Sequence, residues 1–235
     1  MAYRAAMPRL ISVNLGVARP TEHSDLGVTG IDKRPVTRPV EVRAPGPRGS
    51  GGGGLVGDRV CDLRHHGGEE QAVYAYARED LDVWAVQLGR SLPCGTFGEN
   101  LTTTGVDVTA ALIGERWRIG DQVVLEVAAA RIPCRTFAGW LGETGWVRTF
   151  TARARPGAYL RVVEPGAIES GDRVTVVHRP VHDVTIGLAF RALTNERELL
   201  PRLLVAKALP DEAKRKAHKA AMAGWTMPVE DRTGE

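Results

Sequence analysis

The sequence contains no apolar run long enough to cross a bilayer. Its longest apolar-rich stretch near the start, Leu10 to Ala18, is interrupted by Ser12, Asn14 and Gly16. A membrane-spanning helix needs about 20 consecutive, mostly apolar residues. We therefore expect neither export nor membrane insertion, and no membrane partner.

Cysteine is scarce, and the thiols follow no metal-binding spacing. The chain has Cys61, Cys94 and Cys134, an odd number with no C-x-x-C pair. The count argues against a disulfide framework, and the spacing argues against a four-thiolate zinc site. Reduced thiols are typical of the cytoplasm, which is the location we expect.

An excess of charge of one sign is also missing. The 31 Lys and Arg residues against 28 Asp and Glu residues give a net charge of +3, and the basic residues are dispersed. Polymers of nucleic acid are normally bound by a basic stripe, so we expect no such partner, although one local anion site stays open. No G-x-x-x-x-G-K-[ST], G-x-S-x-G or H-E-x-x-H motif is present, which removes the commonest nucleotide-binding, serine-hydrolase and zinc-protease functions.

Short strands dominate the pattern from Ile11 to Val177. Brief alternating apolar runs are separated by Gly, Pro, Asp and Asn, and Gly-Asp turns at 57–58, 120–121 and 171–172 each precede a β-branched run. These runs are typical of the strands of a barrel or a sandwich. The segment 44–54, APGPRGSGGGG, has no side chains able to form a core and is expected to be a flexible surface loop.

Helical spacing occurs in two places. In residues 77–90, Leu81, Trp84 and Leu88 lie at helical intervals ahead of a capping glycine, Gly89, so one helix should interrupt the strands. After residue 180 the apolar period becomes helical, with Pro201 placed at a helix start. We therefore expect a β domain over residues 11–180 and a small unit of three helices over residues 183–225.

The thiol with the most unusual surroundings is Cys134. It follows Pro133 and lies between Arg131 and Arg135. Proline ends strand pairing, so a turn should present the thiol, and neighbouring cations favour the thiolate that binds soft metals or attacks electrophiles. A small buried side chain explains the same cysteine, and the two interpretations stay open at this point.

Two further polar segments carry ligand-type residues. Arg64-His65-His66-Gly67-Gly68 places its two histidines on opposite faces if extended, which disfavours a shared metal and leaves one histidine as a ligand contact or a surface residue. Phe97-Gly98-Glu99-Asn100 offers a carboxylate and an amide, which suit a heteroaromatic ligand or simply form a polar turn.

Taken in order, five segments resemble the MOSC domain, the module named after the C-terminal part of molybdenum cofactor sulfurases. The resemblance is strongest to YiiM-type bacterial members, which carry a C-terminal helical extension, and it covers nearly the whole chain from Ile11 onward. The segments are TGIDKRPV (29–36), GLVGD (54–58), HGGEEQAVYAY (66–76), FGENLTTTG (97–105) and RIPC (131–134).

This resemblance implies a mainly β fold, a closed β-barrel with a few helices, followed by the three-helix unit. It also implies a molybdenum cofactor, in which a molybdopterin dithiolene holds the metal. The implied activity is that of a molybdenum-dependent oxidoreductase, which removes oxygen from N-hydroxylated bases or amidoximes in a two-electron reduction at a cysteine-ligated metal. Because no segment here resembles a flavin or iron–sulfur site, electrons should come from a separate reductase.

By the same resemblance, Cys134 is the metal ligand and the catalytic residue, and Arg131 is its paired cofactor contact. The other implied cofactor-binding residues are Gly98, Glu99, Asn100, His66, Gly67, Lys33 and Thr29, the last two near the cofactor phosphate. Val28 departs from the pattern, since relatives often carry a basic residue there. The glycine-rich insertion at 49–53 is also unusual.

Two other functions use the same residues. A sulfur carrier would need Cys134 to hold a persulfide, and a cofactor carrier would bind the pterin only to transfer it to another enzyme. A non-catalytic scaffold would keep the fold but have no activity. The partners expected for the reductase are a small N-hydroxylated substrate, the electron donor and, as an open alternative, a second copy of the chain.

Overall fold

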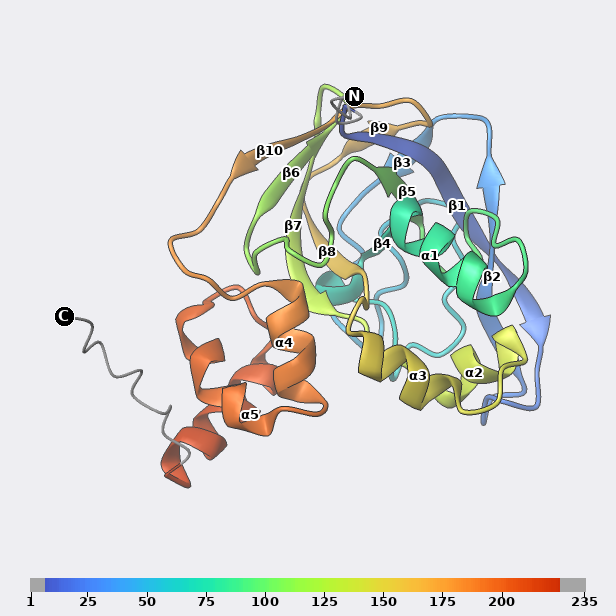
Figure 1. Cartoon of the computed structure of the whole chain (residues 1–235). Coiled ribbons are helices and arrows are strands. Elements are labelled where there is room, and N and C mark those ends of the chain that lie inside the picture. Colours follow the sequence, from blue (N-terminus) through green and yellow to red (C-terminus); the bar gives the residue numbers. More distant parts are fainter. Residues whose placement is uncertain (1–6, 225–235) are drawn as a thin grey trace, which may run out of the picture.

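The computed structural model describes residues 7–224 and is built around one eight-stranded mixed sheet (Figure 1). The strand order is β10-β6-β7-β8-β4-β5-β1-β2, and only β4 and β5 run parallel to each other. A separate two-stranded sheet pairs β3 (Val40–Val42) with β9 (Gly166–Ile168). The strands of the large sheet are β1 (Arg9–Pro20), β2 (Val28–Val36), β4 (Val73–Ala77), β5 (Leu101–Thr104), β6 (Arg116–Ile119), β7 (Val123–Ala130), β8 (Ala158–Glu164) and β10 (Val174–His178).

The sheet-dominated fold predicted from the sequence is confirmed, but its closure into a barrel is not. β10 and β2 are the two edges of the sheet and do not pair with each other in residues 7–224. The start of β1 does reach the turn before β10, through a bridge between Arg9 and Arg173 and a 2.8 Å hydrogen bond from Leu10 N to Asp172 O. These contacts join the start of β1 to residues 171–174, but no strand ladder pairs β10 with β2 in the described residues.

One helix between the strands was predicted correctly, and two were missed. α1 (Arg78–Leu88) buries Leu81 and Trp84 and ends at Gly89, whose φ of 63° is left-handed. The expectation of a single helix is wrong, because α2 (Arg135–Leu141) and α3 (Trp146–Arg153) lie between β7 and β8. Both are too short to show a clear helical period, and their buried aromatic residues are equally typical of strands.

The C-terminal helical unit consists of α4 (Ile186–Leu193), η2 (Arg197–Val205) and α5 (Asp211–Met222). Pro201 lies inside η2, not at a helix start, and η2 is a 3-10 helix. A proline lacks the N–H of the α-helical ladder, which explains why this segment is not α-helical. Residue 225, the expected end of the unit, lies outside the described residues, and the division into two domains stays a prediction. None of the helices in the described part of the chain is long and apolar enough for a membrane span.

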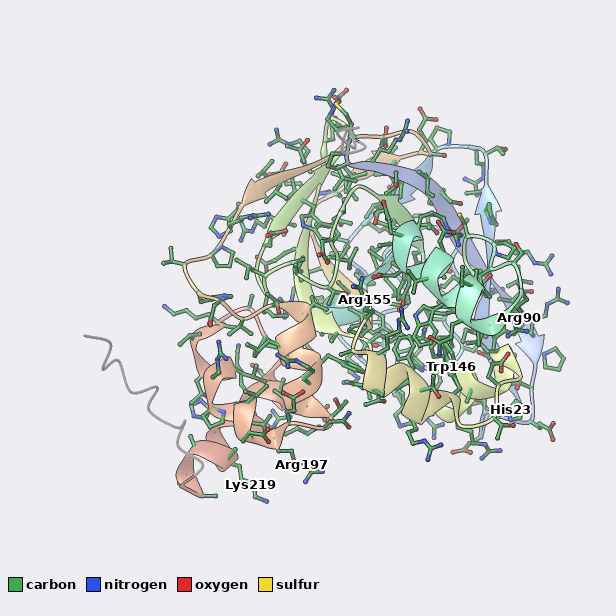
Figure 2. All side chains as sticks on the ribbon, in the orientation of Figure 1. His23, Arg90, Trp146, Arg155, Arg197 and Lys219 are labelled. Atoms are coloured by element: carbon green, nitrogen blue, oxygen red, sulfur yellow. The ribbon has the colours of Figure 1, made fainter. Side chains whose placement is uncertain are left out.

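The helical unit shares its apolar contacts with the rest of the molecule. Ile186 and Phe190 of α4 are fully buried, and the ring of Phe190 lies 6.3 Å from that of Phe150 in α3. The outer end of the unit is polar, and Figure 2 shows Arg197 and Lys219 on it. The apolar stripe predicted for this segment thus has its partner surface within the same chain.

Replacing Phe190 with alanine should lower the free energy of unfolding by about 3–5 kcal/mol, because a buried aromatic ring is lost and a cavity remains. Val181, which is fully exposed, provides the control: Val181→Ala should change stability by less than about 0.5 kcal/mol. Urea unfolding of the two variants measures both values. A Phe190→Ala cost as small as that of the control would show that the helical unit contributes little to the core.

Candidate functional site

A single cleft collects most of the residues expected to carry function. It encloses about 800 Å³ of empty space, counting the part that opens to solvent. Eight of the nine expected site residues line it, and only Glu99 does not. The eight are Cys134, Arg131, Asn100, Gly98, His66, Gly67, Lys33 and Thr29.

Cys134 lies at the N-cap of α2, where the strand-like segment after β7 turns into the helix. Its φ and ψ of −132° and 172° are those of an extended N-cap residue, and its carbonyl accepts the hydrogen bond from Ala138 N at 3.1 Å. The thiol makes no capping hydrogen bond. The residue is partly exposed and lines the cleft, and it also packs against the hydrophobic core. It lies at the start of a helix instead of in the predicted turn.

α2 is fixed by the loop of residues 21–27, which joins β1 to β2 (Figure 2). Arg135 donates through Nη2 to the carbonyl of Glu22 at 2.6 Å, and Thr136 donates through Oγ1 to that of His23 at 2.9 Å. Arg135 is exposed and does not line the cleft. Of the two arginines that flank Cys134 in the sequence, only Arg131 faces the site.

Arg131 is a buried cation without a carboxylate partner among residues 7–224. Its side chain donates to the carbonyl of Phe97, and its guanidinium carbon lies 3.7 Å from the centre of the Phe137 ring and 5.2 Å from that of Tyr74. Burial raises the pKa of both Tyr74 and Tyr159, so neither phenol supplies a negative charge near neutral pH. Burying an unbalanced charge is costly unless a ligand of opposite sign is bound.

Lys33, by contrast, is already neutralised. Its ammonium contacts both carboxylate oxygens of Asp58 at 2.6 Å, and both side chains are buried. The same carboxylate accepts hydrogen bonds from Gly16 N at 2.6 Å and from Asn100 Nδ2 at 3.0 Å. The phosphate contact expected of Lys33 therefore has no support in the geometry and stays a prediction. Arg59, exposed in the same cleft, forms no ion pair with a described residue.

The amide of Asn100 is used mainly to join strands. Its Oδ1 accepts from Tyr74 N at 3.1 Å, while Nδ2 donates to Asn14 O at 3.3 Å and to Asp58. It thereby ties β4 and β1 to the wall of the cleft. Asn100 still lines the cleft, although most of its hydrogen-bonding capacity is occupied.

Glu99 has a structural position behind the loop that precedes β5. Its fully buried carboxylate accepts hydrogen bonds from Gly95 N at 2.6 Å, Phe97 N at 2.9 Å and Thr102 Oγ1 at 2.9 Å. Burial raises its pKa, although these hydrogen bonds oppose the shift. The hydrogen bonds of Glu99 hold the loop that carries Gly98 in place. The direct cofactor contact expected of Glu99 stays a prediction.

Gly67 and Gly98 are glycines because the cleft wall has no room for another side chain there. Both have left-handed φ, 79° and 75°. A Cβ on Gly67 would lie 2.7 Å from the carbonyl oxygen of Gly52, and one on Gly98 would lie 2.9 Å from Cγ1 of Ile31. A substitution at either position would combine backbone strain with a clash.

The two neighbouring histidines lie in different surroundings, although their segment forms a turn and not the extended strand on which their separation was predicted. His65 Nδ1 lies 2.9 Å from Asp62 Oδ2, whereas His66 lines the cleft. His66 is exposed at the surface of the cleft. Partial desolvation lowers its pKa, and the positive charge of Arg131 lowers it further. His66 is therefore neutral near pH 7, and it offers the cleft a hydrogen bond instead of a charge.

The glycine-rich segment, for which the sequence suggested only a flexible loop, forms part of the cleft wall. Gly53 lines the cleft, and the carbonyls of Gly51 and Gly52 lie against Gly67. Arg48 extends this contact, because it donates to the carbonyl of His65 at 3.3 Å and lies 3.9 Å from the carboxylate of Glu212 in α5. The segment thus connects the cleft to the helical unit.

Several cleft residues were missed by sequence reasoning. Asp58 is the aspartate of the first Gly-Asp turn, after which a strand was expected, but residues 59–64 contain no strand. Cys61 lines the cleft, and burial raises the pKa of its thiol although Arg59 and Lys33 oppose the shift. A serine at Cys61 should therefore still have little catalytic effect, because this thiol stays protonated near neutral pH. Others include Ser24, Gln71, Tyr74, Thr136 and Tyr159.

Within residues 7–224, no group of three or more His, Cys, Asp or Glu residues is arranged to hold a metal ion. The cleft offers a ligand a thiol, a buried guanidinium, a neutral imidazole and several amide groups. This set suits an anionic, heteroaromatic ligand together with one soft metal–sulfur contact.

Comparison with known proteins agrees with the family resemblance found in the sequence. Residues 62–175 match the MOSC domain. The chain is 31% identical over 183 residues to the uncharacterized protein YflK of Bacillus subtilis (strain 168). This match covers 77% of this chain and 79% of YflK. It is also 30% identical over 130 residues to a protein of Gibberella moniliformis (strain M3125 / FGSC 7600) named reductase, but that match spans 54% of this chain and only 23% of the reductase.

The fold has a close solved counterpart. The crystal structure of YiiM from Geobacillus stearothermophilus superimposes with a TM-score of 0.72 at 25% sequence identity. The match covers 90% of this chain and 98% of the YiiM chain. It therefore extends over both the sheet and the helical unit.

Proposed function

The chain belongs to the MOSC domain family and is of the YiiM type, and from this membership and the cleft we propose that it is a molybdenum-cofactor-dependent reductase of N-hydroxylated compounds. One observation carries the proposal: Arg131, a buried guanidinium without a counter-charge in the described part of the chain, lines the same cleft as the partly exposed Cys134. The relative named reductase agrees with an enzyme but says nothing of this chain's substrate.

The donor set fits a molybdenum cofactor. A thiolate is a soft ligand suited to a thiophilic metal that is also held by the sulfurs of a pterin dithiolene, so Cys134 would be the protein ligand. Arg131 would bind an anionic group of the cofactor through charge-assisted hydrogen bonds. His66 and Asn100 would meet its polar edges. When bound, the cofactor would supply the two-electron redox chemistry.

The residues of the chain would then position the cofactor and the substrate. The guanidinium of Arg131 is held by the Phe97 carbonyl and the Phe137 ring, so it needs little reorganisation to bind an anion. Neutral His66 could donate or accept a hydrogen bond at a substrate oxygen or nitrogen without adding charge. Electrons would come from a separate reductase, which would dock transiently on the protein.

The decisive experiment is metal analysis of the full chain produced in a host that makes the molybdenum cofactor. We expect close to one molybdenum per chain, and reduction of N-hydroxylated bases or amidoximes when a chemical electron donor is added. Protein from a cofactor-deficient host should be inactive. Equal activity in both preparations would contradict the proposal. Bound molybdenum without reduction, together with transfer of cofactor or persulfide to an acceptor protein, would identify a carrier.

A further inference from the structure

The side chain of Gln71 presents an unusual polar group beside the cleft. It lies at the end of η1 (Glu69–Gln71), shortly after Gly67, and it lines the cleft together with Arg131. Its Oε1 atom is buried and accepts no hydrogen bond from any described residue. A buried acceptor without a partner is destabilising, so its presence needs an explanation.

Three other buried polar side-chain atoms in residues 7–224 lack a partner, and they differ from Gln71. Thr103 and Thr109 carry hydroxyl groups, which can rotate to find an acceptor. Trp146 has its ring packed edge-on to Phe137, 5.5 Å away between centroids. None of these three lines the cleft, whereas Gln71 does.

We propose that the amide of Gln71 recognises the polar edge of a heterocyclic ligand in this cleft, a ring with an N–H group beside an acceptor atom. The inference rests on the proposed function, because it takes the cleft as the ligand site and Arg131 as the anion contact. An amide carries both a carbonyl acceptor and N–H donors, which matches the edge of such a ring. Gln71 would thus set the orientation of the ring, and Arg131 would hold its charged substituent.

The amide can reach the ligand without a change of the backbone. The terminal torsion of glutamine is broad and roughly two-fold, so the amide can rotate to present either its Oε1 or its Nε2 atom to a ligand. The ligand then supplies the missing hydrogen bond. Before binding, the same atom is a cost to the folded protein, and an apolar side chain of similar shape should remove that cost. Replacing Gln71 with an apolar residue should therefore raise the stability of the protein and lower its affinity for the ligand.

Gln71→Leu and Gln71→Met test this pair of effects, and Gln122→Leu is the matched control because Gln122 is exposed and outside the cleft. The probe is pterin-6-carboxylate, compared with benzoate, which has the carboxylate but not the ring edge. Both Gln71 variants should bind the pterin roughly 3- to 10-fold more weakly and benzoate unchanged. Their thermal midpoints should equal or exceed that of the wild type.

A second arm separates the two sources of such a ring, the cofactor and the substrate. In molybdenum-loaded protein, a KM that rises for an N-hydroxylated base but not for benzamidoxime would assign the Gln71 contact to the substrate. A loss confined to pterin-6-carboxylate would assign it to the cofactor. If neither changes, or if the variants lose only stability, Gln71 is structural and the inference is wrong. If the wild-type protein binds no pterin and contains no molybdenum, the proposed function fails and this inference fails with it.

Discussion

Replacing Cys134 with serine should abolish the reduction of N-hydroxylated compounds and leave the fold intact. An alkoxide is a poor substitute for a soft thiolate ligand, and loss of a direct metal ligand should exceed the 10- to 100-fold effects typical of groups that only support ligands. The position itself argues for function. Cys134 occupies the N-cap of α2 but makes no capping hydrogen bond, and serine is among the best N-cap residues. Cys134→Ser should therefore be as stable as the wild type or slightly more stable.

Cys94→Ser is the appropriate control, because Cys94 is equally a free, partly buried thiol but lies outside the cleft. Turnover with a chemical electron donor, molybdenum content and thermal midpoint should be measured for both variants. Wild-type turnover in Cys134→Ser would contradict the proposed role of Cys134 as the metal ligand. A stable Cys94→Ser protein that loses turnover would show that the wrong thiol was chosen.

The sequence predicted the parts of the site that are marked by local chemistry. Cys134 stands out through its proline and arginine neighbours, which leave its role open, and the resemblance to the family points to Cys134, Gly67 and Gly98; all three line the cleft. Helix α1 was predictable because four apolar residues at helical spacing precede a capping glycine. These signals are contained in a few consecutive residues.

The parts that were missed depend on long-range contacts. Nothing in the sequence near Lys33 shows that Asp58, 25 residues away, neutralises it. Arg131 and Arg135 are equally basic in the sequence, but Arg131 is buried against Phe97 and Phe137, whereas Arg135 is exposed and bonded to the 21–27 loop. An unpartnered atom such as Gln71 Oε1 is defined by all of its surroundings, so no local pattern could reveal it.

Arg131→Lys should weaken binding of the anionic cofactor by roughly 10- to 100-fold. The loss of one charged hydrogen bond typically costs about 1.5–3 kcal/mol, which corresponds to that range. The guanidinium at this position donates to the Phe97 carbonyl and stacks on Phe137 at the same time. A single ammonium cannot keep both contacts and also present two parallel donors to an anion. Added inorganic phosphate should compete with the cofactor in the wild-type protein.

Arg135→Lys is the matched control, since Arg135 flanks the same cysteine but is exposed and bonded to the 21–27 loop. Pterin and molybdenum content and N-hydroxyl reductase activity should fall together in Arg131→Lys and stay unchanged in Arg135→Lys. Equal occupancy in the two variants would remove Arg131 from the anion site, and the buried charge would then need another explanation. If occupancy falls while a persulfide on Cys134 still forms and is passed to an acceptor, the thiol acts independently of the anion site. That result would favour a sulfur carrier over the reductase, because a persulfide on Cys134 does not require Arg131 to hold the same ligand.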